Sequence, residues 1–218
     1  MASASSGGHD SKTAFSAVTR RLESPSAERN KGPIWDVLST KVIPRLGDSH
    51  RPWTVLETAA GAGVHTEHFA SELLRMVVAG EGEGEGEAGT DGGGSSGLPF
   101  VWHPSDPSRE ALESIAARVE EHPATLGRVV AAPKQLTLGS TGILEEESRN
   151  GDDGGNNGPL DLLISINMIH ISPWEATLGL MKVAGQQLRA PTDNDDEGGY
   201  LYCYGPYKQD GIIVPSNE

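Results

Sequence analysis

The stretch Val55–Ala70 reads VLETAAGAGVHTEHFA. An apolar run ends in an acid, Glu57, and two glycines one residue apart, Gly61 and Gly63, precede an amphipathic, helix-like pattern. A strand, a tight glycine turn and a helix in this order are typical of a loop that lets the backbone approach a nucleotide-like ligand. An ordinary strand–helix turn is the simpler alternative. The position of the glycines behind a strand and before a helix favours the cofactor loop.

The same alternation of short apolar runs and amphipathic segments continues on both sides of this loop. Strands are predicted over Thr54–Glu57, Phe100–Trp102, Val129–Leu138 (interrupted by Pro133), Leu160–Ile166 and Tyr200–Tyr204, and helices over Ser26–Ile43, Gly63–Val78, Arg109–Glu121 and Trp174–Leu188. Alternating strands and helices predict an α/β fold with an open, mostly parallel, Rossmann-like doubly wound sheet. Ligands of such sheets bind at the carboxyl ends of the strands.

Most of the net charge of −14 is concentrated in three Gly-rich acidic runs, near residues 80–97, 150–159 and 191–199. Each run precedes a predicted strand, so we expect the runs to project from the rim opposite the ligand site. We predict that residues 1–23 form a disordered tail. Residues 24–218 are predicted to form one domain that carries these three acidic insertions. The acidity argues against attraction to nucleic acid or to an anionic membrane, and no apolar run is long enough to span a bilayer.

A single cysteine, Cys203, excludes an internal disulfide and a multi-cysteine zinc site. It fits a cytoplasmic protein. The Ser/Ala-rich start of the chain suggests a weak organelle-targeting segment, but Asp10 and the lack of a basic amphipathic helix favour a plain tail.

His65 and His68 lack the HExxH spacing around Glu67, so no metal site is predicted and a solvated helix face is expected there.

The residues around the loop favour S-adenosylmethionine over a dinucleotide as the cofactor. The dinucleotide fingerprint GxGxxG would need a third glycine where Thr66 stands, and Glu57 would be unfavourable beside a pyrophosphate. An acid before the loop suits a cationic ligand such as S-adenosylmethionine. Asp106 ends the second predicted strand, about twenty residues after the loop once the acidic insertion is removed, where an acid accepts hydrogen bonds from ribose hydroxyls. The alternative is that Asp106 is the N-cap of the next helix; the two roles are compatible, and the ribose role is favoured.

Asn167 and His170 follow the fourth predicted strand, on the expected ligand side. We predict that Asn167 hydrogen-bonds a substrate amide or amine and that His170 acts as a base near neutral pH. A packed histidine bonded to backbone is the alternative for His170.

Five segments and a following PSN together resemble the methyltransferase-like protein 26 family, a domain-of-unknown-function family of class I, S-adenosylmethionine-dependent methyltransferase type. The segments are SPSAERNKGPIWDVL (24–38), VLETAAGAGVHTEHFA (55–70), VWHPSDP (101–107), LLISINMIHISPWEATLGL (162–180) and YGPYKQDG (204–211). The resemblance covers most of the chain from Ser24 onward. It implies a methyltransferase with an unknown small-molecule or protein acceptor.

The resemblance also implies site residues. Glu57, Gly61 and Gly63 match the cofactor loop, Asp106 matches the ribose-binding acid, and Asn167 and His170 lie in the NMIHISP motif. Arg29 and Asn30 belong to ERNKGPI, which is expected to fold over the cofactor pocket.

Two departures from the family pattern stand out. Thr137 stands where an acid is expected near the adenine. The helix and antiparallel strand pair that usually follow the fifth strand are not evident, so we expect the strand Tyr200–Tyr204 to form an exposed edge open to association. A non-catalytic, partner-binding protein of this fold therefore remains an alternative. A nicotinamide-dependent oxidoreductase is a weaker one.

Overall fold

The computed structural model describes residues 20–47, 51–80, 99–147, 159–191, 198–209 and 212–213. The acidic runs near 80–97, 150–159 and 191–199, and residues 1–19 of the tail predicted over 1–23, lie almost wholly outside these residues. The three runs lead into the amino ends of parallel strands of the sheet. This is the rim opposite the predicted ligand site.

A six-stranded sheet organises the chain, in the order β4-β3-β2-β1-β5-β6. Its strands are β1 (Trp53–Thr58), β2 (Phe100–Asp106), β3 (Lys134–Gly139), β4 (Gly142–Glu147), β5 (Leu162–Ile166) and β6 (Tyr200–Tyr204). All neighbouring strands are parallel except β3 and β4. The chain runs from β1 outward to β4 at the edge and then returns to β5 beside β1. This reversal confirms the predicted Rossmann-like, doubly wound α/β fold.

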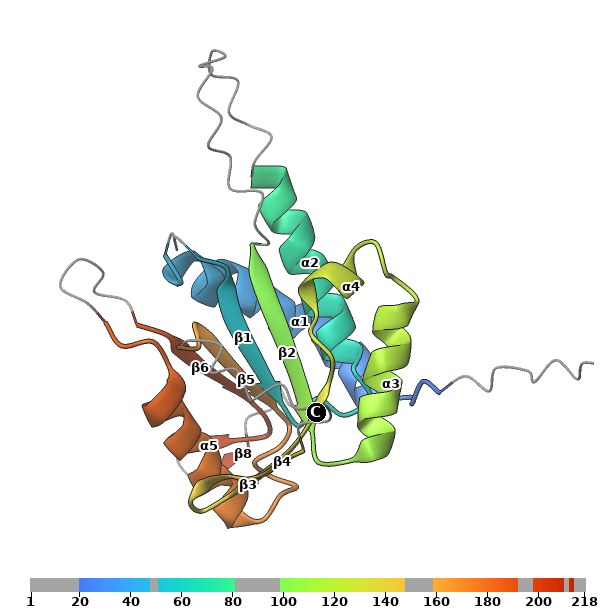
Figure 1. Cartoon of the computed structure of the whole chain (residues 1–218). Helices are drawn as coiled ribbons and strands as arrows, with labels where there is room; N and C mark the ends of the chain where they lie inside the picture. Colours follow the sequence, from blue (N-terminus) through green and yellow to red (C-terminus); the bar gives the residue numbers. More distant parts are fainter. Residues whose placement is uncertain are drawn as a thin grey trace, which may run out of the picture.

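Helices cover both faces of the sheet. Figure 1 shows α2 (Val64–Gly80), α3 (Arg109–Glu120) and α4 (Leu126–Val129) grouped on one side of the sheet, with α5 (Trp174–Gln187) on the other. The first helix, α1 (Pro25–Val37), packs on α2 and continues into the π-helical η1 (Leu38–Val42) and the 3-10 turn η2 (Ile43–Arg45). No described helix is long and apolar enough to cross a membrane.

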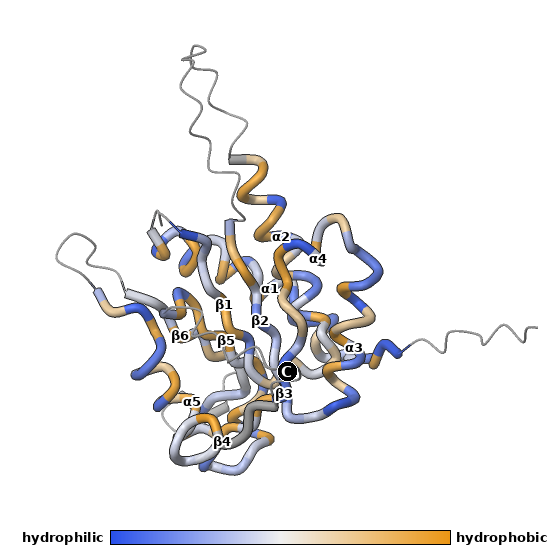
Figure 2. The backbone as a smooth tube through the Cα atoms, viewed as in Figure 1, coloured by the Kyte–Doolittle hydropathy of each residue, from blue (hydrophilic) through white to orange (hydrophobic). Residues whose placement is uncertain are grey.

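Two hydrophobic clusters hold these layers together. Val55, Phe69 and Trp102 belong to the larger cluster, between the sheet and the α1–α4 layer, and Leu163 and Leu180 belong to the smaller one under α5. Figure 2 shows the matching alternation of hydrophobic and hydrophilic segments along α3 and α5. The alternation arises because one stripe of each helix faces the sheet and the other faces water.

The structure corrects the boundaries of three predicted elements. α1 begins at Pro25 and its α-helical part ends at Val37, whereas the predicted helix was Ser26–Ile43, and Pro33 lies inside the helix. β2 runs on to Asp106 instead of ending at Trp102. The third predicted strand begins only after Pro133, because the preceding Leu126–Val129 is helical.

β4 is an additional strand, antiparallel to β3 across a short turn. A separate two-stranded ladder, β7 (Lys208–Gln209) with β8 (Ile212–Ile213), follows β6 and does not join the main sheet.

Candidate active site

The loop between β1 and α2 is the centre of the candidate site. Its backbone has positive φ at Ala59 (+53°), Gly61 (+55°) and Gly63 (+79°). The Gly63 N–H donates to the Ala60 carbonyl (3.1 Å), and the Ala60 N–H donates to the Ser105 carbonyl of β2 (2.9 Å). These bonds fix a tight left-handed turn, a conformation that glycine adopts most easily.

The two glycines of the loop meet different demands. A Cβ added at Gly63 would lie 2.9 Å from Ile115 Cγ1, so this position is required for close packing on α3. A Cβ added at Gly61 would meet no atom within 4 Å. Gly61 therefore borders open space at the carboxyl end of β1, as expected where a backbone must approach a ligand.

Asp106 ties the end of β2 to this loop. Its Oδ2 accepts a hydrogen bond from the Gly61 N–H (2.9 Å), and its Oδ1 accepts one from the Ser108 N–H (2.8 Å). The alternative interpretation of Asp106 as a helix N-cap is wrong, because Ser108 is the N-cap of α3 and accepts from the Ala111 N–H. Each carboxylate oxygen keeps a second lone pair, so the ribose contact stays a prediction.

Glu57 lies below the loop, in the interior. Its side chain points into the α1–α4 face, where Oε2 accepts hydrogen bonds from Thr66 Oγ1 (2.7 Å) and Trp102 Nε1 (2.9 Å). Burial raises the pKa of Glu57 to about 7, against the lowering effect of these two hydrogen bonds. This placement makes Glu57 a support of the loop. Its contact with a ligand ammonium stays a prediction.

The ERNKGPI segment lies in α1 and reaches the start of α2. Asn30 Oδ1 lies 2.8 Å from His65 Nε2, whereas Arg29 is exposed. His65 is buried, with 6% of its surface exposed, so the expected solvated helix face is wrong for this residue. Burial lowers the pKa of His65 to about 4, and the nearby His68 lowers it further. The ring is therefore neutral, and its Nε2–H donates to Asn30.

Asn167 and His170 lie in the loop after β5, next to the β1 loop at the same rim of the sheet. Asn167 has a φ of +58°, and its N–H donates to the Tyr204 carbonyl (2.8 Å). His170 is exposed, and a Cβ added at Gly205 would lie 3.5 Å from its Nδ1. This exposure argues against the alternative of a packed histidine.

Thr137 lies on β3, the strand beside β2 on the side away from β1. The register partner of Asp106 on β3 is Gln135, so Thr137 stands two residues beyond it, toward the carboxyl end. Thr137 is half-buried beside a bulge in β3.

In the described part of the chain, no group of three or more His, Cys, Asp or Glu side chains could hold a metal ion.

These residues surround the point where the chain reverses its winding, between β1 and β5. The loops after these two strands, with Asp106 beside them, form the rim where doubly wound folds bind their ligands. A family model matches residues 97–218, which include the β2 and β5 parts of this rim. The chain belongs to the family described as "Protein of unknown function (DUF938)".

Solved structures similar to this DUF938 chain include three proteins of low identity. One is the DszA carbon methyltransferase (13% identity, 84% of this chain and 36% of that one, TM-score 0.46). Another is YjhP from E. coli (15% identity, 84% of this chain and 51% of that one, TM-score 0.45). A third is a SAM-dependent methyltransferase from Aquifex aeolicus (16% identity, 91% of this chain and 81% of that one, TM-score 0.40). The chain thus spans about a third and about half of the first two. The fold assignment rests on the strand order.

Proposed function

We propose that this protein is an S-adenosylmethionine-dependent methyltransferase and that the cofactor lies across the β1–α2 loop. The observation that carries the proposal is the open space at Gly61, whose N–H is bonded to Asp106 at the end of the neighbouring strand. A ligand in that space would contact the loop backbone and the carboxylate together. The segments quoted above support the finer proposal that the chain is a relative of the methyltransferase-like protein 26 family.

The proposed roles follow from these positions. Asp106 would accept hydrogen bonds from the ribose through its remaining lone pairs, Thr137 would face the adenine side, and Arg29 with Asn30 would cover the pocket from α1. Gly61 and Gly63 would let the backbone lie close to the cofactor, and Glu57 would support the loop or meet the ammonium group.

The chemistry would need position more than acid–base groups. Bound S-adenosylmethionine supplies an electrophilic methyl group. The protein has to align the acceptor with it and to remove a proton only if the acceptor carries one to lose. Asn167 and His170, in the loop beside the cofactor loop, are proposed to orient a small-molecule or protein acceptor and to take that proton.

Calorimetric titration of the purified chain with S-adenosylmethionine tests the proposal. We expect micromolar binding that Gly61→Arg abolishes, because the added side chain would occupy the open space. Gly185→Arg is the matched control, since Gly185 also meets no atom within 4 Å but lies near the end of α5, at the opposite rim. Absence of binding by a folded chain would contradict the proposal. Binding of NAD instead would favour the oxidoreductase.

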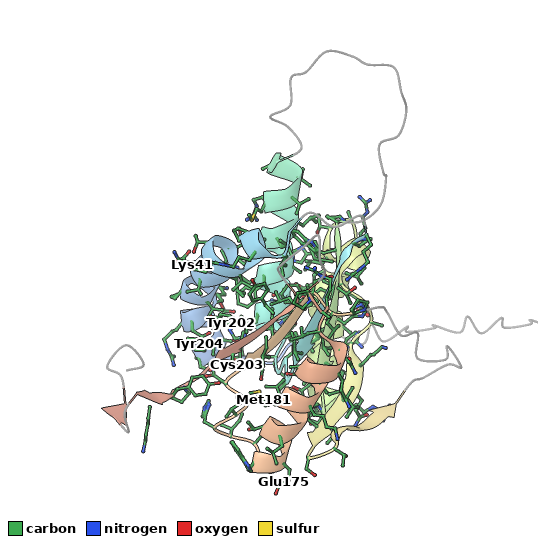
Figure 3. The ribbon with its side chains drawn as sticks, turned by 90° about the vertical axis from the view of Figure 1, so that its left-hand side faces the viewer. Lys41, Glu175, Met181, Tyr202, Cys203 and Tyr204 are labelled. Atoms are coloured by element: carbon green, nitrogen blue, oxygen red, sulfur yellow. The ribbon has the colours of Figure 1, made fainter. Side chains whose placement is uncertain are left out.

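The outer edge of β6 favours the second candidate, a non-catalytic partner-binding protein. Tyr200 donates to Asp161 and Tyr204 accepts from Asn167, so the alternate residues Leu201 and Cys203 turn their backbone groups away from β5. Figure 3 shows Tyr202, Cys203 and Tyr204 on this edge, between Lys41 of η1 and Met181 of α5. An open strand edge is a template for pairing with another chain.

Analytical ultracentrifugation tests this second candidate, with a second copy of the chain as the partner. Cys203→Pro removes an outward N–H without removing a hydrogen bond to β5, so it should abolish any dimer that pairs through β6. A monomer at all concentrations, or a dimer unaffected by Cys203→Pro, would contradict pairing through this edge.

A further inference from the structure

Two buried polar side chains of α3 point at the cofactor loop. Ser114 is 0% exposed and Arg118 is 4% exposed. Ser114 Oγ donates to the Ala62 carbonyl (2.9 Å), and Arg118 Nε donates to the same carbonyl (2.7 Å). Both lone pairs of one loop carbonyl are thereby used by side chains that lie outside the loop.

These two bonds constrain the peptide between Ala62 and Gly63. The C=O and N–H of a trans peptide point in opposite directions. When the Ala62 carbonyl is held toward α3, the Gly63 N–H points back into the loop, where it donates to the Ala60 carbonyl at 3.1 Å. Ser114 and Arg118 therefore fix the orientation that closes the turn around Gly61.

The same two side chains also hold the N-terminal segment. The Leu22 N–H donates to Ser114 Oγ (2.8 Å), and Arg118 Nη2 donates to the Leu22 carbonyl (3.0 Å). Ser114 and Arg118 thus form a direct link between the backbone of Leu22 and that of Ala62. No other described side chains make hydrogen bonds to both segments.

Charged groups complete the link. Glu67 of α2 accepts hydrogen bonds from Arg118 Nη1 (2.6 Å) and Arg21 Nη2 (3.1 Å), and its Oε1 lies 3.4 Å from His122 Nε2. Arg21 also pairs with Glu121 at the end of α3. Every nitrogen of the Arg118 guanidinium has a partner, which a buried arginine requires.

We infer that Ser114 and Arg118 are positioning residues of the cofactor loop, and that through them the N-terminal segment Arg20–Leu22 controls the order of that loop. When the segment is docked, both side chains are fixed and the Ala62 carbonyl stays turned toward α3. When it is undocked, Ser114 and Arg118 lose one partner each and the loop loosens. For its effect on S-adenosylmethionine affinity, this inference rests on the function proposed above.

Hydrogen–deuterium exchange of the full ligand-free chain tests the link directly. The reporter is a peptide covering residues 57–66, since the N–H groups of Ala60, Gly61 and Gly63 are all bonded. We expect about fivefold faster exchange there in Ser114→Ala and Arg118→Met, since each variant loses one hydrogen bond to the Ala62 carbonyl of the loop. Arg21→Ala, which touches neither the loop nor Ala62, should raise it about twofold, as half-exposed ion pairs contribute less.

Two controls separate positioning from general destabilisation. Arg109→Met removes an exposed arginine of the same helix and should leave the peptide over 57–66 unchanged. A peptide over β5 should exchange as in the wild type in every variant. Unchanged loop exchange in Ser114→Ala and Arg21→Ala, or an increase matched by β5, would overturn the inference. If Arg118→Met does not fold, the exchange of Ser114→Ala and Arg21→Ala decides whether the inference holds.

A titration with S-adenosylmethionine gives the functional readout. Ser114→Ala should weaken binding about fivefold while the Gly185→Arg control binds as the wild type does. Wild-type affinity in Ser114→Ala would overturn the functional part of the inference. A wild-type chain that binds no S-adenosylmethionine would contradict the proposed function, whereas the exchange experiment would still decide the role of Ser114 and Arg118.

Discussion

The Gly61 N–H donates a 2.9 Å hydrogen bond to Oδ2 of Asp106, joining residues 45 positions apart in the chain. The bond locks the turn after β1 to the end of β2, and Oδ1 of the same carboxylate holds the start of α3 through Ser108. The acid predicted from the sequence as a ligand contact is therefore also a structural brace of the loop that would hold the ligand.

We predict that Asp106→Asn destabilises the protein by about 1–3 kcal/mol, because an amide NH₂ replaces one oxygen and leaves one backbone N–H without an acceptor. Urea denaturation measures the loss. Glu113→Gln, the same change at an exposed residue of α3, is the control and should stay within about 0.5 kcal/mol of the wild type. Equal stabilities of the two variants would show that the brace contributes nothing.

The two glycines of the loop should respond differently to alanine. Gly61→Ala should cost about 1–2 kcal/mol, since only the positive φ is unfavourable. Gly63→Ala should cost about 2–5 kcal/mol, because the new Cβ would also lie 3.0 Å from the Ile115 Cα in α3. Thermal denaturation of both variants makes the comparison. A larger loss for Gly61→Ala would contradict the packing role assigned to Gly63.

The fold was predictable where periodicity was strong. The buried run that became β5 and the amphipathic pattern of α3 gave both elements within two residues. β4 was missed because three of its six residues are the acids Glu145–Glu147, which give no apolar alternation. The third strand was predicted to begin at Val129, which instead ends the helical turn Leu126–Val129, because a valine suits a strand and a helix alike.

The site was predictable at the loop and less so beneath it. A glycine pair between a strand and a helix identifies a turn by local chemistry alone. The support from Ser114 and Arg118 depends on packing between segments about 50 residues apart. Position alone could not show that Glu57 and His65 point inward, because a strand or helix residue beside a loop can face either the core or the ligand.

Glu57 should make stability depend on pH. Its pKa rises from 4.5 in the unfolded chain to about 7 in the fold because the carboxyl is buried. The folded state then binds more protons than the unfolded state, so stability due to this group falls as pH rises from about 4.5 to 7. The wild type should lose on the order of 3 kcal/mol relative to Glu57→Gln over that range, as measured by urea denaturation at each pH.

His65 should act in the opposite direction. Its pKa falls from 6.5 to about 4 because the ring is buried, so the unfolded state binds more protons and stability rises with pH between those values. The two groups offset each other in the wild type between about pH 4.5 and 6.5. Glu57→Gln should unmask the rise due to His65. A Glu57→Gln variant with the same pH profile as the wild type would refute the buried, titrating carboxyl.

Asp161 forms the corresponding buried charge at the opposite rim. It is 0% exposed, and its oxygens accept from Arg51 Nη2 (3.0 Å), Arg189 Nε (2.9 Å) and the Thr54 N–H (2.8 Å) at the amino ends of β1 and β5. Asp161→Asn should cost about 3–5 kcal/mol, since neutralising this buried acid breaks its ion pairs with Arg51 and Arg189.

Urea denaturation of Asp161→Asn against an exposed control, Asp36→Asn, measures this loss. Because the Asp161–Arg189 pair is largely buried, its part of the loss should persist in high salt. The folded variant should bind S-adenosylmethionine as the wild type does, since Asp161 lies at the end of the sheet away from Gly61 and Asp106. A small loss would contradict a stabilising role of the Asp161 ion pairs. Weakened binding at full stability would mean that the two rims are coupled through the sheet.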